Sequence, residues 1–165
     1  MKWTVLAADP FNARYQILSD YLGSQGLESD FVPVDVCSKA FSSVLKEAQA
    51  EFDQLRIGSP FNRECMNFFS NFDSLLMQTN SFDTLFREHG NWWPRCCTYT
   101  AFVEALNRKA PLAFREQAAL IAGSGMSARA AIVALARAGV KKFSITNPSD
   151  EESLDLIQHI QKHFF

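Results

Sequence analysis

The residues of this sequence that are best suited to chemistry form a glycine-rich turn in the second half of the chain. Gly123-x-Gly125-x-x-Ala128 matches the fingerprint of a dinucleotide-binding turn. The first glycine permits the tight turn, the second lets the backbone approach a pyrophosphate, and the third position must be small so that helix and strand pack closely. The N–H groups and the positive dipole at the start of the next helix would face the phosphates. The alternative is a tight turn that serves folding alone.

The segments around this turn follow the order that the fingerprint requires. Residues 117–122 are typical of a buried strand, an alanine-rich helix is expected over 126–138, and a second strand over 141–146. A glycine turn between a strand and a helix of this length separates a nucleotide-binding fingerprint from a chance match. We therefore expect nucleotide-binding ancestry.

An acidic residue that binds the ribose belongs about 20 residues after such a turn, at the end of the second strand. Asp150 is the candidate, although its simpler role is to stabilise the start of the final helix. Ser149 and Glu152 have the spacing of a capping box there. No arginine follows the strand to hold a 2′-phosphate, so the sequence favours NAD over NADP. The remaining alternative is that no cofactor binds.

Metal binding and thiol chemistry find less support. His159 and His163 lie four residues apart on the expected final helix and could share a metal, but no third ligand lies near them in the sequence. We expect two exposed histidines and no metal. The cysteines form no C-x-x-C pair, which favours reduced thiols. They are Cys37, Cys65, Cys96 and Cys97.

The rest of the chain also alternates between strand and helix patterns, which predicts an α/β fold with a parallel sheet. Pro33 favours a sheet edge for its strand, and His89-Gly90-Asn91 is typical of a hairpin turn. Ala110-Pro111 marks a boundary. The expected elements are strands at 2–8, 29–36 and 55–58, helices at 13–22, 40–52 and 63–77, a β-hairpin at 84–97, and a helix at 98–107.

Composition limits the classes of partner. The 165 residues are 47% hydrophobic and 21% charged, with a net charge of −2, so nothing indicates binding to nucleic acid or to an acidic membrane surface. No apolar run approaches the roughly 20 residues of a membrane span. The first residues read as a strand and not as a secretory signal, which makes the cytoplasm the expected location.

The glycine turn resembles the cofactor segment of the shikimate and quinate dehydrogenases. Residues 123–130, GSGMSARA, are similar to that family's GAGGAxRA, and residues 145–147, ITN, to the strand that ends in NRT. Met126 replaces a glycine, and Pro148 replaces the arginine that family members use for the phosphate of NADP. The cofactor site that this resemblance implies consists of Gly123, Ser124, Gly125, Met126, Ala128, Arg129, Asn147 and Asp150.

The first half is similar to the same family in the order of its segments. Residues 56–62, RIGSPFN, take the place of NVTxPxK, residues 81–84, SFDT, that of AxNT, and residues 98–101, TYTA, that of NTDG. The implied fold is α/β, with a small α/β substrate-type domain over 1–105 and a truncated Rossmann-like βαβα unit over 106–165. Family members continue through a second mononucleotide half.

The departures from the family fall on its chemistry. The catalytic lysine corresponds to Asn62 and its partner aspartate to Thr100. Asp83 is the fallback base, with a helix or hairpin cap as its simpler role. The leading hypothesis is a non-catalytic homologue that binds a nucleotide weakly or acts through protein contacts. The alternatives are an NAD(P)-dependent shikimate- or quinate-type oxidoreductase with rearranged catalytic residues, or a fragment of a longer such enzyme.

A Rossmann sheet of only two strands would leave an open edge and an uncovered apolar face. We therefore expect a homo-oligomer that covers this surface. The final helix is expected to carry one apolar stripe, formed by Leu154, Ile157, Ile160 and Phe164. The last three of these are the expected contact residues.

Overall fold

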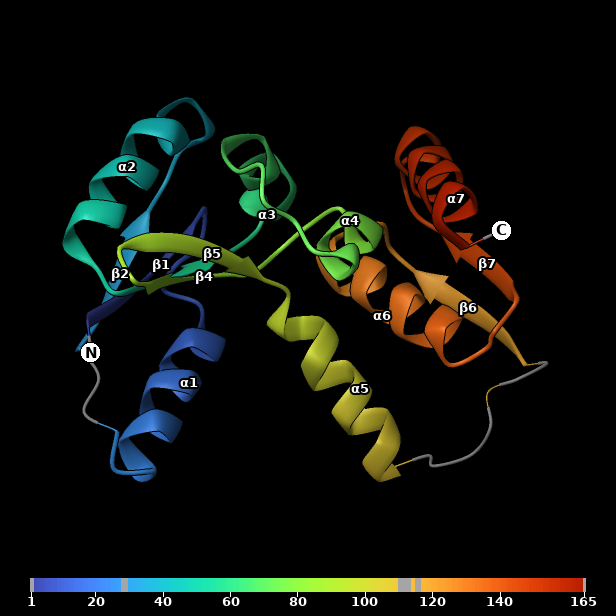
Figure 1. Ribbon diagram of the computed structural model, residues 1–165, viewed down its shortest axis with the longest axis horizontal. Coiled ribbons are helices and arrows are strands. Elements are labelled where there is room, and N and C mark those ends of the chain that lie inside the picture. Colours follow the sequence, from blue (N-terminus) through green and yellow to red (C-terminus); the bar gives the residue numbers. More distant parts are fainter. Residues whose placement is uncertain (1, 28–29, 110–113, 115–116, 165) are drawn as a thin grey trace. The chain divides into compact units, whose positions relative to one another are not determined.

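Two separate sheets organise the chain, and each belongs to its own compact unit (Figure 1). The computed structural model describes residues 2–27, 30–109, 114 and 117–164. The first unit runs up to Asn71 and includes Phe82–Arg95, and the second contains Phe72–Ser81 and the chain from Cys96 onward. The predicted α/β class is confirmed.

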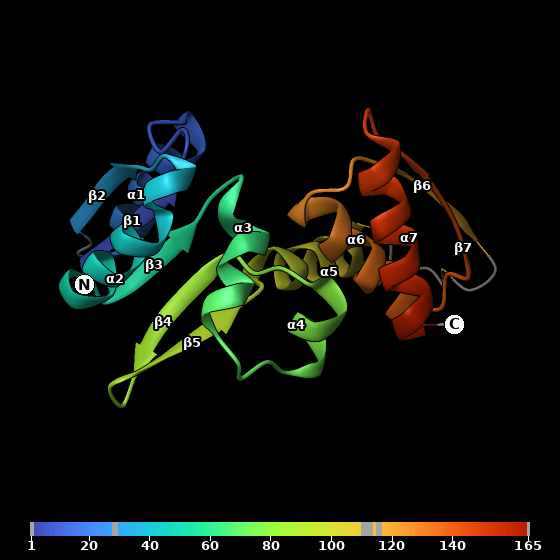
Figure 2. The same cartoon turned by 90° about the horizontal axis from the view of Figure 1, so that it is seen from above.

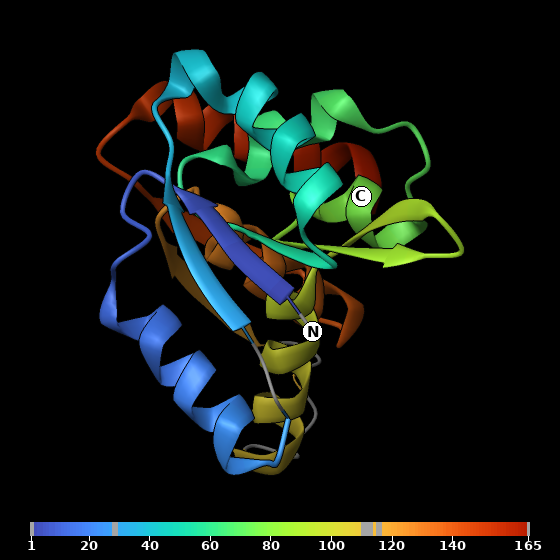
Figure 3. The ribbon, with the colours of Figure 1, turned by 90° about the vertical axis from the view of Figure 1, so that its left-hand side faces the viewer.

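The first unit is a five-stranded sheet in the order β2-β1-β3-β4-β5. The apolar strand β1 is central and pairs in parallel with β2 and β3, whereas β4 is antiparallel to both its neighbours. Helices α1 and α2 cover opposite faces of this sheet (Figure 3). The elements are β1 (Lys2–Ala7), α1 (Ala13–Ser24), β2 (Asp30–Asp35), η1 (Ser38–Ala40), α2 (Phe41–Glu51), β3 (Gln54–Ile57), α3 (Phe61–Glu64), η2 (Cys65–Phe68), β4 (Thr84–Glu88) and β5 (Asn91–Arg95).

Two local predictions for this unit are confirmed. Pro33 lies on β2, which is an edge strand, where its missing N–H breaks no inner ladder. The hairpin of β4 and β5 turns through His89 and Gly90, which have φ angles of 50° and 80°. A two-residue turn with both central residues at positive φ matches the twist of the strands that it joins.

The helix predicted over 63–77 is wrong. The chain instead forms α3 and η2, leaves the helical conformation at Phe69, and begins α4 (Ser74–Thr79) only after Asp73. The Phe69 ring packs edge-on against Phe82, and the Asp73 carboxylate accepts the N–H of Leu76 as an N-cap. Aromatic anchoring and a new cap therefore interrupt a segment whose apolar spacing suits a helix.

The second unit contains a parallel pair of strands with two helices against one face (Figure 2). The core joins Ile121 of β6, Ile132 of α6, and Leu156 and Ile160 of α7. The elements are α4, α5 (Cys97–Lys109), β6 (Ala118–Ala122), α6 (Met126–Arg137), β7 (Lys142–Thr146) and α7 (Asp150–Phe164). The βαβα order predicted for this part is confirmed, and the predicted boundary at Ala110-Pro111 lies outside the described residues.

The apolar stripe predicted for α7 differs from the face that the structure buries. The two compact units also differ from the predicted division at residue 105. The core face of α7 carries Leu156 and Ile160, whereas Leu154 is 57% exposed. The buried Ile160 is therefore unavailable as the contact residue that the sequence suggested. Helices α4 and α5 belong to the second unit because both pack on α6.

Candidate functional site

The glycine turn connects β6 to α6 and has the backbone that the fingerprint predicts. Gly123 has a φ of 107°, a conformation that favours glycine, and its N–H donates to the Thr146 carbonyl of β7 at 2.7 Å. Gly125 is the N-cap of α6, and among the described residues no side chain caps the start of this helix. A Cβ built on Gly123 or Gly125 would meet no atom within 4 Å. The turn therefore leaves open the space from which a phosphate would approach the first amides of α6.

Ala128 fills the third position of the fingerprint as predicted. It lies on the first turn of α6 and packs against the core cluster that contains Ile121 and Ile132. A larger side chain would push α6 away from β6 at this point. The fingerprint thus acts here in helix–strand packing as well as in opening the turn.

The buried side chain of Arg129 donates a hydrogen bond to the backbone of the glycine turn. Its side chain is only 3% exposed, its Nε donates to the Ser124 carbonyl at 3.1 Å, and its Nη2 lies 2.9 Å from Asp155 Oδ2 on α7. The guanidinium fork suits this double role because it offers several donors in fixed directions. Arg129, one of the cofactor residues that the resemblance implied, therefore positions the turn through buried contacts.

Glu152 reaches the turn from the other side, and sequence reasoning did not assign it to the site. Its Oε2 accepts hydrogen bonds from Ser124 Oγ at 2.5 Å and from Asn147 Nδ2 at 3.1 Å. Its backbone N–H donates to Ser149 Oγ at 3.3 Å, which is half of the predicted capping box. The capping-box spacing singles out Glu152 in the sequence. It does not indicate that the Glu152 carboxylate also accepts a hydrogen bond from Ser124 of the glycine turn.

The other predicted residues of the nucleotide site lie near the same turn with less specific contacts. Met126 begins α6, and Asn147 follows β7 and also donates to the Ser149 carbonyl at 3.1 Å. Asp150 is exposed in the first turn of α7, and its carboxylate makes no hydrogen bond within the part of the chain that the structure describes. Three carboxylates, those of Asp150, Glu151 and Glu152, belong to this first turn.

The position of the family's catalytic lysine is filled by a structural amide. The Asn62 Nδ2 donates to the carbonyls of Ile57 at 2.6 Å and Phe82 at 3.0 Å, and the side chain is buried. These bonds join the end of β3 to the segment that leads into β4. Thr100, at the position of the partner aspartate, is exposed on α5 and belongs to the other unit.

Asp83, the fallback base, is fully buried at the start of the hairpin. Its Oδ1 lies 3.2 Å from Arg56 Nη1 and accepts a hydrogen bond from Thr84 Oγ1 at 2.8 Å. Its backbone carbonyl accepts the N–H of Ile57, and its own N–H donates to Arg95. This arrangement ties three strands together and matches the capping role better than that of a base.

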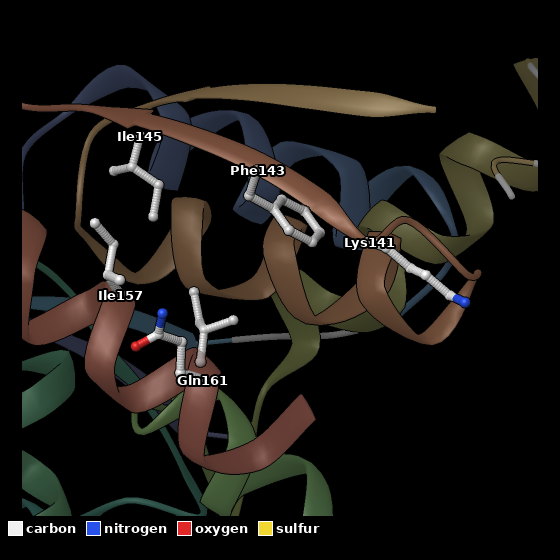
Figure 4. Close-up of a pocket in the computed structure, with 6 residues that line it drawn as sticks. Lys141, Phe143, Ile145, Ile157 and Gln161 are labelled. Carbon is white, nitrogen blue, oxygen red and sulfur yellow. The ribbon is translucent and has the colours of Figure 1, made fainter. Parts of the chain in front are cut away.

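An apolar crevice of about 260 Å³ lies between β7 and α7 (Figure 4). Phe143 and Ile145 point from β7 toward Ile157 and Gln161 on α7, while Lys141 extends away from them. None of its lining residues belongs to the glycine turn. The crevice therefore does not extend the nucleotide site.

The two histidines of α7 do not match the exposed pair expected from the sequence. His159 is partly buried, and its Nε2 lies 2.8 Å from the Gln78 carbonyl on α4, so this nitrogen carries the proton. Burial lowers the pKa of His159. No group of three metal-ligating side chains occurs among the described residues.

Two further findings concern the thiol groups of the cysteines and the length and apolar character of the helices. None of the four cysteines forms a disulfide within the described residues, and burial raises the pKa of the Cys65 thiol, which disfavours its reactive thiolate. None of the helices in the described ranges combines the length and the apolar character needed to span a bilayer.

Comparisons with known proteins match the fold and not the sequence. No family model and no curated protein matches the chain. Shikimate dehydrogenase from Aquifex aeolicus has a similar structure, with a TM-score of 0.84 and 17% identity over 98% of this chain and 60% of that one. The Thermus thermophilus enzyme in complex with NADP(H) and shikimate has a TM-score of 0.80 and 20% identity over 98% of this chain and 61% of that one. The Listeria monocytogenes enzyme in complex with shikimate and NAD has a TM-score of 0.81 and 17% identity over 98% of this chain and 57% of that one.

These likenesses show that the chain has the fold of the shikimate dehydrogenases, as the sequence resemblance predicted. The chain spans about 60% of the length of the Aquifex aeolicus enzyme. At these identities the comparison establishes the fold, and the activity has to be argued from the residues of the site.

Proposed function

We propose that this chain, which has the fold of the shikimate dehydrogenases, is a non-catalytic protein that binds an adenine dinucleotide weakly at its glycine turn. The observation that supports a non-catalytic role is the pair of side-chain hydrogen bonds made by Asn62. The side chain at the position of the family's lysine donates its amide hydrogens to the backbone carbonyls of Ile57 and Phe82. It is part of the scaffold of the first unit.

Loss of the lysine removes the proton transfer that alcohol oxidation requires. As hydride leaves the carbon, the hydroxyl must lose its proton to a group that can titrate. An amide such as Asn62 does not accept that proton at ordinary pH, and Thr100 supplies no carboxylate. Removal of a positioned general base typically lowers a rate by about 10² to 10⁴-fold.

The geometry of the turn supports nucleotide binding. The positive φ of Gly123, the open space before Gly125 and the uncapped start of α6 fit a pyrophosphate that accepts backbone N–H groups. A bound NAD would supply a hydride acceptor, and this chain would hold its phosphates at the turn. The carboxylate of Glu152 beside Ser124 places negative charge near the ligand, which is why we expect weak binding.

NAD is the preferred form of the cofactor in this proposal. Pro148 stands where the family has its arginine for the 2′-phosphate, and three carboxylates follow it in the first turn of α7. A 2′-phosphate would face like charge without a cationic partner at that position.

A second candidate function is protein contact, in the form of self-association. Leu120 on β6 is 74% exposed, on the face of the two-stranded sheet opposite α6 and α7. Exposed apolar sheet surface of this kind favours an interaction site. We therefore also propose a homo-oligomer, with Leu120 replacing the buried Ile160 among the contact residues.

Calorimetric titration of NAD into the protein and into Gly125→Val tests the nucleotide site. Gly125 has φ −70° and ψ −176°, an extended backbone that valine adopts, and its Cβ would meet no protein atom. The variant should therefore fold while its side chain blocks the approach of phosphate. We expect measurable NAD binding by the unmodified protein and its loss in Gly125→Val.

Gly23→Val on α1 is the matched control, because a Cβ there also meets no atom within 4 Å. It should bind NAD like the unmodified protein. Unchanged binding in Gly125→Val would place the nucleotide elsewhere, and the absence of NAD binding by the unmodified protein would refute the proposed function.

A further inference from the structure

The glycine turn and the start of α7 are joined by one side chain. Glu152 Oε2 accepts from Ser124 Oγ, within the turn, and from Asn147 Nδ2, just after β7. These partners fix the position of a carboxylate that would otherwise move freely on an exposed helix. The charge therefore stands at a defined place beside the turn.

The two other carboxylates of the same helical turn are not held in this way. Asp150 and Glu151 are exposed, and their carboxylates make no hydrogen bond to the residues that the structure describes. They contribute to the local potential, but water screens them and their side chains can turn away. Of the three carboxylates, only Glu152 is seen bonded to a residue of the glycine turn.

We propose that Glu152, and not Asp150, is the residue that makes the site select an unphosphorylated ribose; this inference rests on the proposed nucleotide site. A carboxylate accepts a hydrogen bond from a ribose hydroxyl, in the manner that the Ser124 hydroxyl already uses. A phosphate on that hydroxyl removes the donor and brings a second anion against a fixed charge.

The variant that isolates this charge is Glu152→Gln. Glutamine has nearly the same shape, and its amide oxygen can still accept from Ser124 and Asn147. The change therefore removes the negative charge and leaves the bridge in place. Glu151→Gln is the matched control, because it makes the same change of charge on the same helical turn at a carboxylate that makes no hydrogen bond to the described residues.

The measurement is the ratio of the dissociation constants of NADP and NAD, obtained by calorimetric titration for each protein. The two probes differ only in the 2′-phosphate. Removing one charge a few ångströms from a phosphate is worth on the order of a factor of ten in water-rich surroundings. We expect the NADP-to-NAD ratio to fall about tenfold in Glu152→Gln and by less than about threefold in Glu151→Gln.

Thermal unfolding of each variant shows that it is folded before the titrations are compared. NAD binding with an unchanged ratio in Glu152→Gln, or an equal fall in both variants, would overturn the role of Glu152 and leave the nucleotide site standing. Failure of the unmodified protein to bind NAD would overturn both this inference and the proposed function.

Discussion

Asn62 connects two segments of the first unit through one side-chain amide. Both acceptors, the carbonyls of Ile57 and Phe82, lie inside the fold, where water cannot replace a lost donor. The residue therefore has a role that depends on hydrogen bonding and not on a titrating proton. This role is open to a direct test of stability.

Replacing Asn62 with alanine should lower the free energy of unfolding by about 1–3 kcal/mol, because two carbonyls lose their donor. Urea denaturation measures this loss. Asn71→Ala is the control: Asn71 is exposed and makes no hydrogen bond to the described residues, so its replacement should change stability by less than about 0.5 kcal/mol. Equal effects of the two changes would contradict the structural role of Asn62.

The sequence predicts part of the nucleotide site at this scale. The roles of Gly123 and Ala128 follow from local backbone and packing rules, so the fingerprint identifies them without a structure. The bridge from Ser124 to Glu152 joins residues 28 positions apart, and it depends on the pairing of β6 with β7. The burial of Arg129 was likewise hidden, since its ion partner lies on another helix.

Between elements, the junction of α6 and α7 depends on a charged contact. Arg129 is almost completely buried, whereas Asp155 is 42% exposed on its side chain. Loss of Asp155 therefore leaves a buried guanidinium without this counter-charge, while loss of Arg129 would leave a carboxylate that water can reach. Loss of Asp155 is therefore the more destabilising of the two changes, because the buried guanidinium of Arg129 has less access to water than the Asp155 carboxylate.

Asp155→Asn should accordingly destabilise the protein by about 1–3 kcal/mol, a value below that for fully buried pairs because Asp155 is in contact with water. The comparison is Glu104→Gln, which breaks the exposed pair of Glu104 with Arg108 on α5. Such exposed pairs contribute about 0.3–0.5 kcal/mol. If urea denaturation gave the same small loss for both, Arg129 would not depend on Asp155.

The contact between α7 and α4 should make stability depend on pH. Burial lowers the pKa of His159, and the nearby His163 and Arg129 lower it further, whereas the hydrogen bond to Gln78 and the charge of Asp155 raise it. The unfolded chain therefore takes up a proton at a higher pH than the folded one. Stability is full above the ordinary histidine pKa of 6.5 and is lost as the pH falls below it.

The melting temperature followed from neutral to mildly acidic pH tests this dependence. His159→Gln, which cannot take up the proton, should reduce the fall in stability on acidification. His89→Asn is a suitable control, because His89 is exposed in the hairpin turn and asparagine tolerates its φ of 50°. An undiminished fall in His159→Gln would rule out His159 as the source.

The elements themselves were predictable where periodicity and breakers agree. The β4–β5 hairpin follows from His89-Gly90, and the edge position of β2 from Pro33. The segment 63–77 was not predictable in this way. Its apolar spacing suits a helix, but the chain leaves that conformation where Phe69 packs against Phe82 and where Asp73 caps the start of α4.

For the molecule as a whole, the two-stranded sheet of the second unit presents an apolar residue to solvent. A homo-oligomer would cover Leu120 and the open strand edges. Light scattering should therefore report a mass above that of one chain, and Leu120→Ser should shift it toward the monomer. Ile17→Ser changes a similarly exposed side chain on α1 and should leave the mass unchanged. A monomer for the unmodified protein would refute the proposal.

The proposed function requires that a dinucleotide binds to this protein without being reduced. The direct measurement is the absorbance of reduced nicotinamide after shikimate or quinate is added to the protein with NAD or with NADP, at concentrations at which titration shows NAD bound. We predict no reduction above the protein-free blank, because Asn62 and Thr100 replace the groups that would carry the proton. Sustained reduction that remains with the purified protein and disappears in Gly125→Val would contradict the claim.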